Sequence, residues 1–135
     1  MDLAISKLRG MTPELESKIR STGVKTTDDF FKAALTPAGR EELANCAGVS
    51  TQVILELANR ADLARIKGIA GVYSDLLEEA GVDTVKELKE RTAEKLHAKL
   101  LEINALKNLT VHPPSLGMVK KWILLAKRRR KFLQY

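Results

Sequence analysis

Apolar residues recur at spacings of three and four along almost the whole chain. Leu15 and Ile19 show this spacing near the N-terminus, and Val119, Ile123 and Ala126 show it near the C-terminus. Such a period places apolar side chains on one face of a helix. Alternating β-branched and polar residues, which would indicate strands, are absent from the sequence. The pattern therefore predicts an all-α fold.

Polar capping residues and glycines divide this pattern into separate helices. Threonine and serine accept hydrogen bonds from the first turn of a helix, and proline is favoured at the first helical position. Glycine favours the left-handed conformation in which many helices end. The expected starts are Thr12-Pro13, Thr26, Thr36-Pro37, Ser50, Thr84 and Thr92, and the expected ends include Gly23, Gly48, Gly68 and Gly81. Pro113-Pro114 predicts a loop before a last helix.

The two halves of the sequence resemble each other at an offset of 58 residues. The matched pairs include Gly10 with Gly68, Gly23 with Gly81, Val24 with Val82 and Thr26 with Thr84. No Gly/Ser-rich or Pro-rich linker separates the halves. We therefore expect a single helical domain over residues 1–135, made of two units at about 1–66 and about 67–135. The units should share one core and be related by an approximate two-fold axis.

The composition excludes several classes of protein. With 135 residues, 44% of them hydrophobic and 30% charged, the chain is typical of one globular domain. Its aromatic content of 4% is too low for a surface that stacks nucleobases. The longest apolar run, residues 122–126, is too short to cross a bilayer, and no secretion signal is visible. We therefore expect a cytoplasmic protein without integral membrane association, in keeping with a single cysteine that has no disulfide partner.

The net charge of +6 is confined to the second half of the chain. Residues 1–66 carry nine Lys/Arg and nine Asp/Glu, whereas residues 67–135 carry fourteen and eight. The strongest concentration consists of Lys120, Lys121, Lys127, Arg128, Arg129, Arg130 and Lys131. Long cations on one surface attract phosphates, and each neutralised phosphate releases counterions. The cations therefore favour an anionic partner, while the alternative is that they solvate a chain end and suit the dipole of the last helix.

Residues 127–135 form the end of this basic region. They follow the apolar stripe of the last expected helix, which Ile123 and Ala126 complete. We therefore expect a charged terminal extension whose removal leaves the fold largely intact. Phe132 and Tyr135 are expected either to dock on the core or to anchor a partner.

Gly68-Ile69-Ala70-Gly71 is the sharpest local motif, and it resembles the turn of a helix-hairpin-helix unit. Such a turn aims backbone N–H groups at a phosphate beside a helix N-terminus, and glycine allows the close approach. Ile69 would anchor the turn in the core, and Lys67 would add a positive charge. Ala70 stands where the motif has its second glycine, although Gly71 follows directly. The alternative is a turn that serves only helix packing.

Other reactive side chains show no catalytic or metal-binding pattern. His97 and His112 lack further ligands at metal spacing, so we expect no metal and no cofactor. Cys46 is expected to be a small buried hydrophobe at a helix end, and Trp122 a core residue. The sequence contains no P-loop, nucleophile elbow or dinucleotide fingerprint, which favours a protein that is not an enzyme. A structural cluster of ion pairs is expected where the two units join, from Arg60, Asp62 and Arg65.

Motifs over nearly the whole chain resemble those of one family. They include Thr36-Pro37-x-Gly39-Arg40, Asn59-Arg60-Ala61-Asp62-Leu63, Arg65-Ile66-Lys67-Gly68-Ile69, Ala80-Gly81-Val82-Asp83-Thr84-Val85-x-Glu87-Leu88, Leu96-His97, Asn104, Pro114-Ser115 and Trp122-Ile123. The family consists of bacterial tandem helix-hairpin-helix proteins catalogued as a domain of unknown function. The resemblance implies tandem helix-hairpin-helix units and a non-enzymatic role compatible with DNA binding. It implies no substrate and no catalytic residues.

These observations lead to a functional prediction with one rival. We expect a module that contacts the backbone of duplex DNA with little sequence specificity, through residues 67–71 and the basic C-terminal residues. The rival is a protein-interaction or scaffold module whose basic C-terminal helix meets an acidic partner surface. The zero net charge of residues 1–66 and the single glycine of the first turn, at Gly10, favour this rival.

Overall fold

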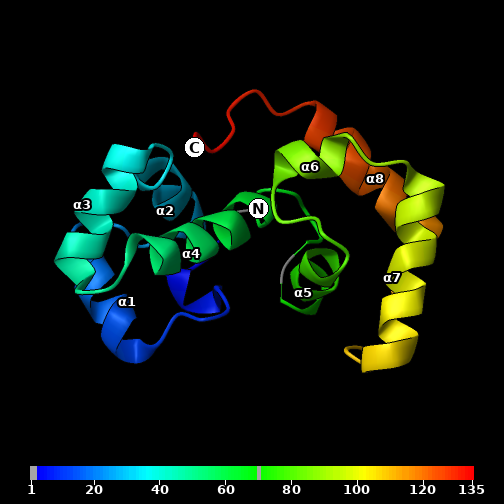
Figure 1. The fold of residues 1–135 in the computed structure, drawn as a ribbon, viewed down its shortest axis with the longest axis horizontal. Coiled ribbons are helices and arrows are strands. Elements are labelled where there is room, and N and C mark those ends of the chain that lie inside the picture. The colour runs from blue at the N-terminus through cyan, green and yellow to red at the C-terminus, as the bar shows by residue number, and fades with distance from the viewer. Residues whose placement is uncertain (1–2, 70) are drawn as a thin grey trace.

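The computed structural model describes residues 3–69 and 71–135, and in these ranges the protein is helical (Figure 1). A 3-10 helix, η1 (Ile5–Lys7), precedes eight α-helices: α1 (Pro13–Arg20), α2 (Thr27–Ala33), α3 (Pro37–Ala47), α4 (Thr51–Leu63), α5 (Val72–Glu79), α6 (Val85–Lys89), α7 (Ala93–Lys107) and α8 (Leu116–Lys127). The only β-type pairing in the described residues is an isolated bridge between Ala4 and Thr26. The predicted all-α class is confirmed.

Side-chain caps fix where most of these helices begin. In six of the eight α-helices the hydroxyl of the N-cap residue accepts a hydrogen bond from the amide three positions on; the caps are Thr12, Thr26, Thr36, Ser50, Thr84 and Ser115. Thr92 holds the N-cap position of α7 without such a bond. Gly48 ends α3 in the left-handed conformation, with φ of +68°. The predicted starts follow from these local bonds, which a short stretch of sequence specifies. The predicted end at Gly68 is wrong, because α4 ends at Leu63 and the chain continues through turns to Gly68.

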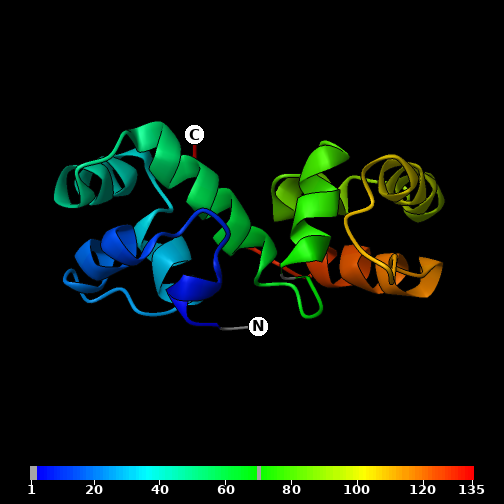
Figure 2. The ribbon, with the colours of Figure 1, turned by 90° about the horizontal axis from the view of Figure 1, so that it is seen from below.

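Buried hydrophobic side chains form two clusters, and this corrects the expectation of one shared core. The first cluster combines η1 with α1 to α4, and the second combines α5 to α8. Figure 2 shows the corresponding lobes, which meet where α4 ends. The boundary between the two clusters lies at the end of α4. Ile54, Leu57 and Ala61 of this helix pack in the first cluster, whereas Leu63, in its last turn, packs in the second. One helix therefore contributes to both clusters.

Local backbone structure recurs at the offset of 58 residues. Gly10 and Gly68 have φ angles of +92° and +93°, and Gly23 and Gly81 have φ angles of +96° and +85°. Three backbone hydrogen bonds of the first half have counterparts in the second: Leu8 N to Ile5 O with Ile66 N to Leu63 O, Met11 N to Leu8 O with Ile69 N to Ile66 O, and Gly23 N to Arg20 O with Gly81 N to Glu78 O. The superposition of the two halves about a two-fold axis stays a prediction.

The C-terminal segment returns from α8 to the first lobe (Figure 1). Leu133 is only 6% exposed and belongs to the first hydrophobic cluster. The backbone of Gln134 donates to Leu35 O at 2.8 Å, and Arg40 Nη2 donates to Gln134 O at 2.5 Å. The expectation that residues 127–135 form a simple terminal extension is therefore wrong, because this segment ties the second lobe to the first.

A buried ion pair lies where the lobes meet. The Asp62 carboxylate accepts hydrogen bonds from Arg65 and, at 2.9 Å, from the backbone N–H of Val85. The Arg65 guanidinium also lies 3.9 Å from the centroid of the Phe31 ring and donates to Lys131 O at 2.9 Å. Burial raises the pKa of Asp62, and the charge of Arg65 acts in the opposite direction. The predicted pairing of Asp62 with Arg65 at the junction is confirmed, whereas Arg60 pairs with Asp75 and Glu78 of α5 instead.

The start of α2 is a reciprocal capping box. The Thr26 hydroxyl accepts from Asp29 N at 3.1 Å, and the Asp29 carboxylate accepts from Thr26 N at 3.2 Å. The backbone N–H of Lys25, which donates to the same carboxylate, lowers the pKa of Asp29 below its ordinary value of 3.8. The ionised form is therefore stabilised by folding.

The Asp29→Asn variant should unfold with a weaker acid dependence than the wild type. The stability that ionised Asp29 contributes is complete above pH 3.8 and is lost as the pH falls through the lowered pKa of the folded protein. Urea unfolding between about pH 6 and about pH 2 measures this difference, with Asp28→Asn as the control. Equal acid dependence in the wild type and Asp29→Asn would contradict the role of this cap.

One apolar position differs from the sequence analysis. Cys46 is exposed rather than buried, because it lies on the outer face of α3 while Leu43 and Ala47 face the core. Leu106, near the end of α7, is 79% exposed. Within the described residues no helix combines the length and apolar character that a membrane span requires.

Candidate nucleic-acid interface

The turn between α4 and α5 is built around one buried side chain. Ile69 is 1% exposed, and its N–H donates to Ile66 O at 3.0 Å. Gly68 and Gly71 have positive φ angles, and both are exposed, as is Lys67. Ala70, which the sequence analysis included in this motif, lies outside the described residues. The predicted anchoring of the turn by Ile69 is confirmed.

The exposed part of the turn leads directly into α5. Gly71 is the N-cap residue, and as a glycine it offers no side chain to cap the helix. The Ser74 hydroxyl instead donates to Gly71 O at 2.8 Å, which fixes the first turn of the helix. Unbonded N–H groups at a helix start, together with the helix dipole, attract anions. The start of α5 therefore has no side-chain cap, and uncapped helix starts are places where proteins contact anions.

The indole of Trp122, in α8, packs against this turn. The indole is 2% exposed and packs in the second cluster, which confirms the predicted core role of Trp122. A Cβ added at Gly68 would lie 3.1 Å from Trp122 Nε1, so the backbone approaches the indole closely. The Tyr73 ring lies on the same indole, with 5.5 Å between ring centroids. Helix α8 thus holds the turn in place.

Cations of the first unit also lie near this turn, and the sequence analysis missed them. Arg9 Nη1 lies 2.5 Å from Asp75 Oδ2, and Arg60 Nη1 lies 2.8 Å from Asp75 Oδ1. Lys7 and Arg9 line a small cleft of about 20 Å³ together with Gly71. The internal repeat could have indicated Arg9, because an offset of 58 matches Arg9 with Lys67. A charge count over whole halves of the chain does not show this correspondence.

The basic C-terminal residues have different environments. Lys120 lies 3.8 Å from Glu94, whereas the side chains of Lys121, Lys127, Arg128, Arg130 and Lys131 are exposed without a carboxylate at ion-pair distance in the described chain. Arg129 Nη2 donates to Arg65 O at 2.6 Å. Arg65 is two residues before Lys67, so this bond brings the basic segment next to the turn. Two regions that lie 64 residues apart in the sequence are therefore neighbours in the structure.

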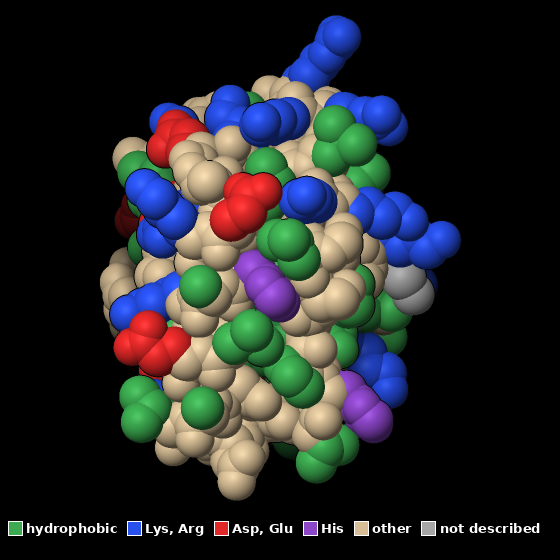
Figure 3. Space-filling model, turned by 90° about the vertical axis from the view of Figure 1, so that its right-hand side faces the viewer, with side chains coloured by type: hydrophobic (Ala, Val, Ile, Leu, Met, Phe, Trp, Pro, Cys, Tyr) green, Lys and Arg blue, Asp and Glu red, His purple; other side chains and the backbone are tan. Residues whose placement is uncertain are grey.

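The face formed by α7 and α8 combines basic and apolar side chains. Figure 3 shows Lys and Arg side chains around exposed hydrophobic ones on this side of the molecule. Leu106 and Val111 are 79% and 88% exposed. His97 is half-buried, with Nε2 at 3.0 Å from Pro114 O. Across the described residues no group of His, Cys, Asp and Glu has the arrangement of a metal site.

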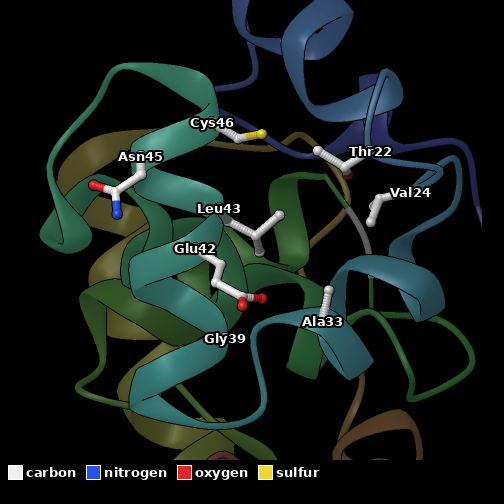
Figure 4. A pocket seen from close by; sticks show the side chains of 8 residues that line it. All are labelled: Thr22, Val24, Ala33, Gly39, Glu42, Leu43, Asn45 and Cys46. Carbon is white, nitrogen blue, oxygen red and sulfur yellow. The ribbon is translucent and has the colours of Figure 1, made fainter.

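A groove lies elsewhere, between α3 and the segment joining α1 to α2 (Figure 4). Its volume is about 710 Å³, and the lining residues are Thr22, Val24, Ala33, Gly39, Glu42, Leu43, Asn45 and Cys46. None of these is a cation, and Glu42 is an acid. The groove therefore lacks cationic groups that would attract a phosphate.

The architecture places the protein among all-helical proteins whose exposed glycine turns join successive helices. The chain belongs to the family described as a domain of unknown function, DUF4332, whose family model matches residues 9–129. Comparison with curated proteins and with solved structures gives no match.

Proposed function

We propose that this protein is a non-enzymatic module that binds the sugar-phosphate backbone of duplex DNA with little sequence specificity. The observation that carries the proposal is the hydrogen bond from Arg129 to Arg65 O, which places the basic C-terminal segment beside the α4–α5 turn, and we take the two together as the binding surface. In the turn, Lys67 and Gly71 are exposed. Backbone N–H groups and long cations are the groups that proteins use to contact phosphates.

In this proposal the two parts of the surface have separate roles. The turn would hold one phosphate through backbone N–H groups beside Gly71, with Lys67 neutralising its charge. The exposed cations Lys127, Arg128 and Arg130 would attract further phosphates. Contacts confined to the backbone carry no direct information about sequence, so the affinity should depend on salt much more than on base composition.

We further propose that the two halves are tandem helix-hairpin-helix units related by an approximate two-fold axis. The recurrence of glycine φ angles and of three backbone hydrogen bonds at the offset of 58 supports this relation. The turn containing Gly10 is then the counterpart of the turn containing Gly68. Pro13, directly after Thr12, offers no N–H group, which weakens the first turn as a phosphate site.

The Lys67→Gln variant should bind duplex DNA more weakly than the wild type and with a shallower salt dependence. Loss of one phosphate contact should reduce the slope of log K against log salt by about one. Fluorescence anisotropy with a labelled duplex at several NaCl concentrations measures the slope. Glycine variants are less suitable here, because Gly68 and Gly71 have positive φ angles that would strain any replacement.

Lys107→Gln provides the matched control for this variant. Lys107 is also an exposed lysine, but its Nζ lies 2.6 Å from Glu79 Oε2, at the end of α7. This substitution should leave the slope unchanged. If both variants bind DNA as the wild type does, the turn is not a phosphate site.

Exposed apolar side chains favour a second candidate function. Leu106 and Val111 are almost fully exposed, and such residues are common in protein interfaces. In this alternative the basic C-terminal helix meets an acidic partner surface. A wild-type protein that fails to bind duplex DNA at low salt would favour this alternative.

A further inference from the structure

A second basic site lies at the junction of α6 and α7, away from the α4–α5 turn. A pocket of about 340 Å³ opens there, lined by Ala80, Glu90, Arg91, Thr92, Lys95, Leu96 and Lys99. Three of these side chains are cations and one is a carboxylate, so the lining carries two net positive charges. The sequence analysis did not single out its cations Arg91, Lys95 and Lys99.

Two of the three cations lie on one face of α7, and the third comes just before this helix. Lys95 and Lys99 are spaced by four residues, which places their side chains on the same helix face, whereas Arg91 directly precedes the N-cap residue Thr92. Arg91 Nη2 donates to Gly81 O at 3.2 Å, which holds the guanidinium at the pocket. In the described residues no carboxylate lies within ion-pair distance of any of the three.

This arrangement is electrostatically unfavourable for the protein alone. Like charges at a spacing of four repel each other across one helical turn. Cations near the start of a helix also oppose its dipole, which favours acidic residues there. The protein pairs other cations, as Lys18 with Glu14 and Arg20 with Glu16 show. A bound anion would relieve both unfavourable effects at the α6–α7 junction.

We propose that the pocket lined by Arg91, Lys95 and Lys99 binds a phosphate group. An arginine held by a backbone carbonyl gives a directional donor, and two flexible lysines add charge around it. Glu90 in the lining limits the excess positive charge of the pocket to two, which suits a single phosphate or pyrophosphate. The phosphate belongs either to a free anion or to a nucleic-acid backbone.

The test uses the full chain with inorganic pyrophosphate as the probe. Thermal unfolding and amide chemical shifts are followed during titration, with NaCl of matched ionic strength as the reference. Wild-type protein should show a saturable increase in melting temperature, and the amide shifts should centre on residues 91–99. Lys95→Gln and Lys99→Gln should each weaken pyrophosphate binding by about tenfold.

If Lys95 had only a structural role, the Lys95→Gln substitution would not reduce the response to pyrophosphate. Removing one like charge should raise the melting temperature of the unliganded Lys95→Gln variant while lowering its response to pyrophosphate. Lys107→Gln, in the same helix but paired with Glu79, is the matched control and should respond as the wild type does. An equal response of the wild type and Lys95→Gln, or a wild-type response no larger than that to NaCl, would overturn the proposal.

A second arm with a duplex DNA distinguishes the two sources of phosphate. If Lys95→Gln and Lys99→Gln weaken both pyrophosphate and DNA binding, the pocket takes a backbone phosphate. If they weaken pyrophosphate binding alone, the pocket takes a free anion. Because Lys67 is outside this pocket, Lys67→Gln should leave pyrophosphate binding unchanged, so failure of the DNA proposal leaves the pocket proposal separately testable.

Discussion

The Asp62→Ala variant should lose about 3–5 kcal/mol of the free energy of unfolding, the largest effect that we expect from one substitution. The Asp62 carboxylate is fully buried and accepts hydrogen bonds from Arg65 and from Val85 N. Its removal leaves the buried charge of Arg65 without its counterion and the first amide of α6 without its acceptor. Arg65 contacts Phe31 of the first lobe, and Val85 begins α6 of the second lobe, so both groups belong to the junction.

Urea unfolding at neutral pH, followed by circular dichroism, measures this loss. Glu14→Ala is the control, because Glu14 also pairs with a cation, at 3.4 Å from Lys18, but is exposed. That variant should stay within about 0.5 kcal/mol of the wild type. A loss of less than about 1 kcal/mol in Asp62→Ala would show that the junction does not depend on this ion pair.

The Leu133→Ala variant should lose about 2–3 kcal/mol, the second largest effect. Leu133 lies in the first hydrophobic cluster although the preceding helix, α8, belongs to the second. Truncation removes apolar contacts and also loosens the adjacent bonds of Gln134 to Leu35 and Arg40. The loss should appear as a lower midpoint of urea unfolding.

Leu106→Ala is the matched control for Leu133→Ala. It removes the same atoms from a leucine that is 79% exposed, so its effect should lie within about 0.5 kcal/mol. Equal midpoints for the two variants would mean that the C-terminal segment does not stabilise the first lobe. In that case its only role would be the contribution of its cations.

Elements that depend on short stretches of sequence could be predicted. Thr26, Ser50 and Thr84 cap helices through bonds to residues three positions away, so the sequence around each contains the necessary information. The burial of Ile69 and Trp122 followed from their places in apolar patterns. The ion pair of Asp62 with Arg65 followed from opposite charges three residues apart at the point where the halves join, whereas the pairing of Arg60 with Asp75 depends on how α4 and α5 pack.

Long-range contacts could not be predicted in this way. Arg40 and Gln134 are 94 residues apart, and no periodicity connects them. Leu133 follows five consecutive cations and Phe132, so local composition indicated an exposed end although the side chain is buried. The division of the core depends on where α4 ends relative to both lobes, which helix periodicity does not specify.

In the candidate site, too, some residues could be predicted from a local motif and others only from the three-dimensional structure. Lys67, Gly68 and Gly71 were predicted from one local motif. The place of Arg9 beside Asp75 depends on packing of the first unit against α5. The pocket at Arg91 and Lys95 needed coordinates, because its cations are ordinary surface residues in the sequence.

The salt dependence of wild-type binding to two unrelated 20-base-pair duplexes tests the central claim most directly. Fluorescence anisotropy at NaCl concentrations from about 50 to about 300 mM gives log K against log salt for each duplex. A DNA-backbone module should bind both duplexes within about threefold of each other, with slopes of about −3 or steeper, corresponding to three or more neutralised phosphates. Absence of binding at about 50 mM NaCl, or a slope near zero, would contradict the account.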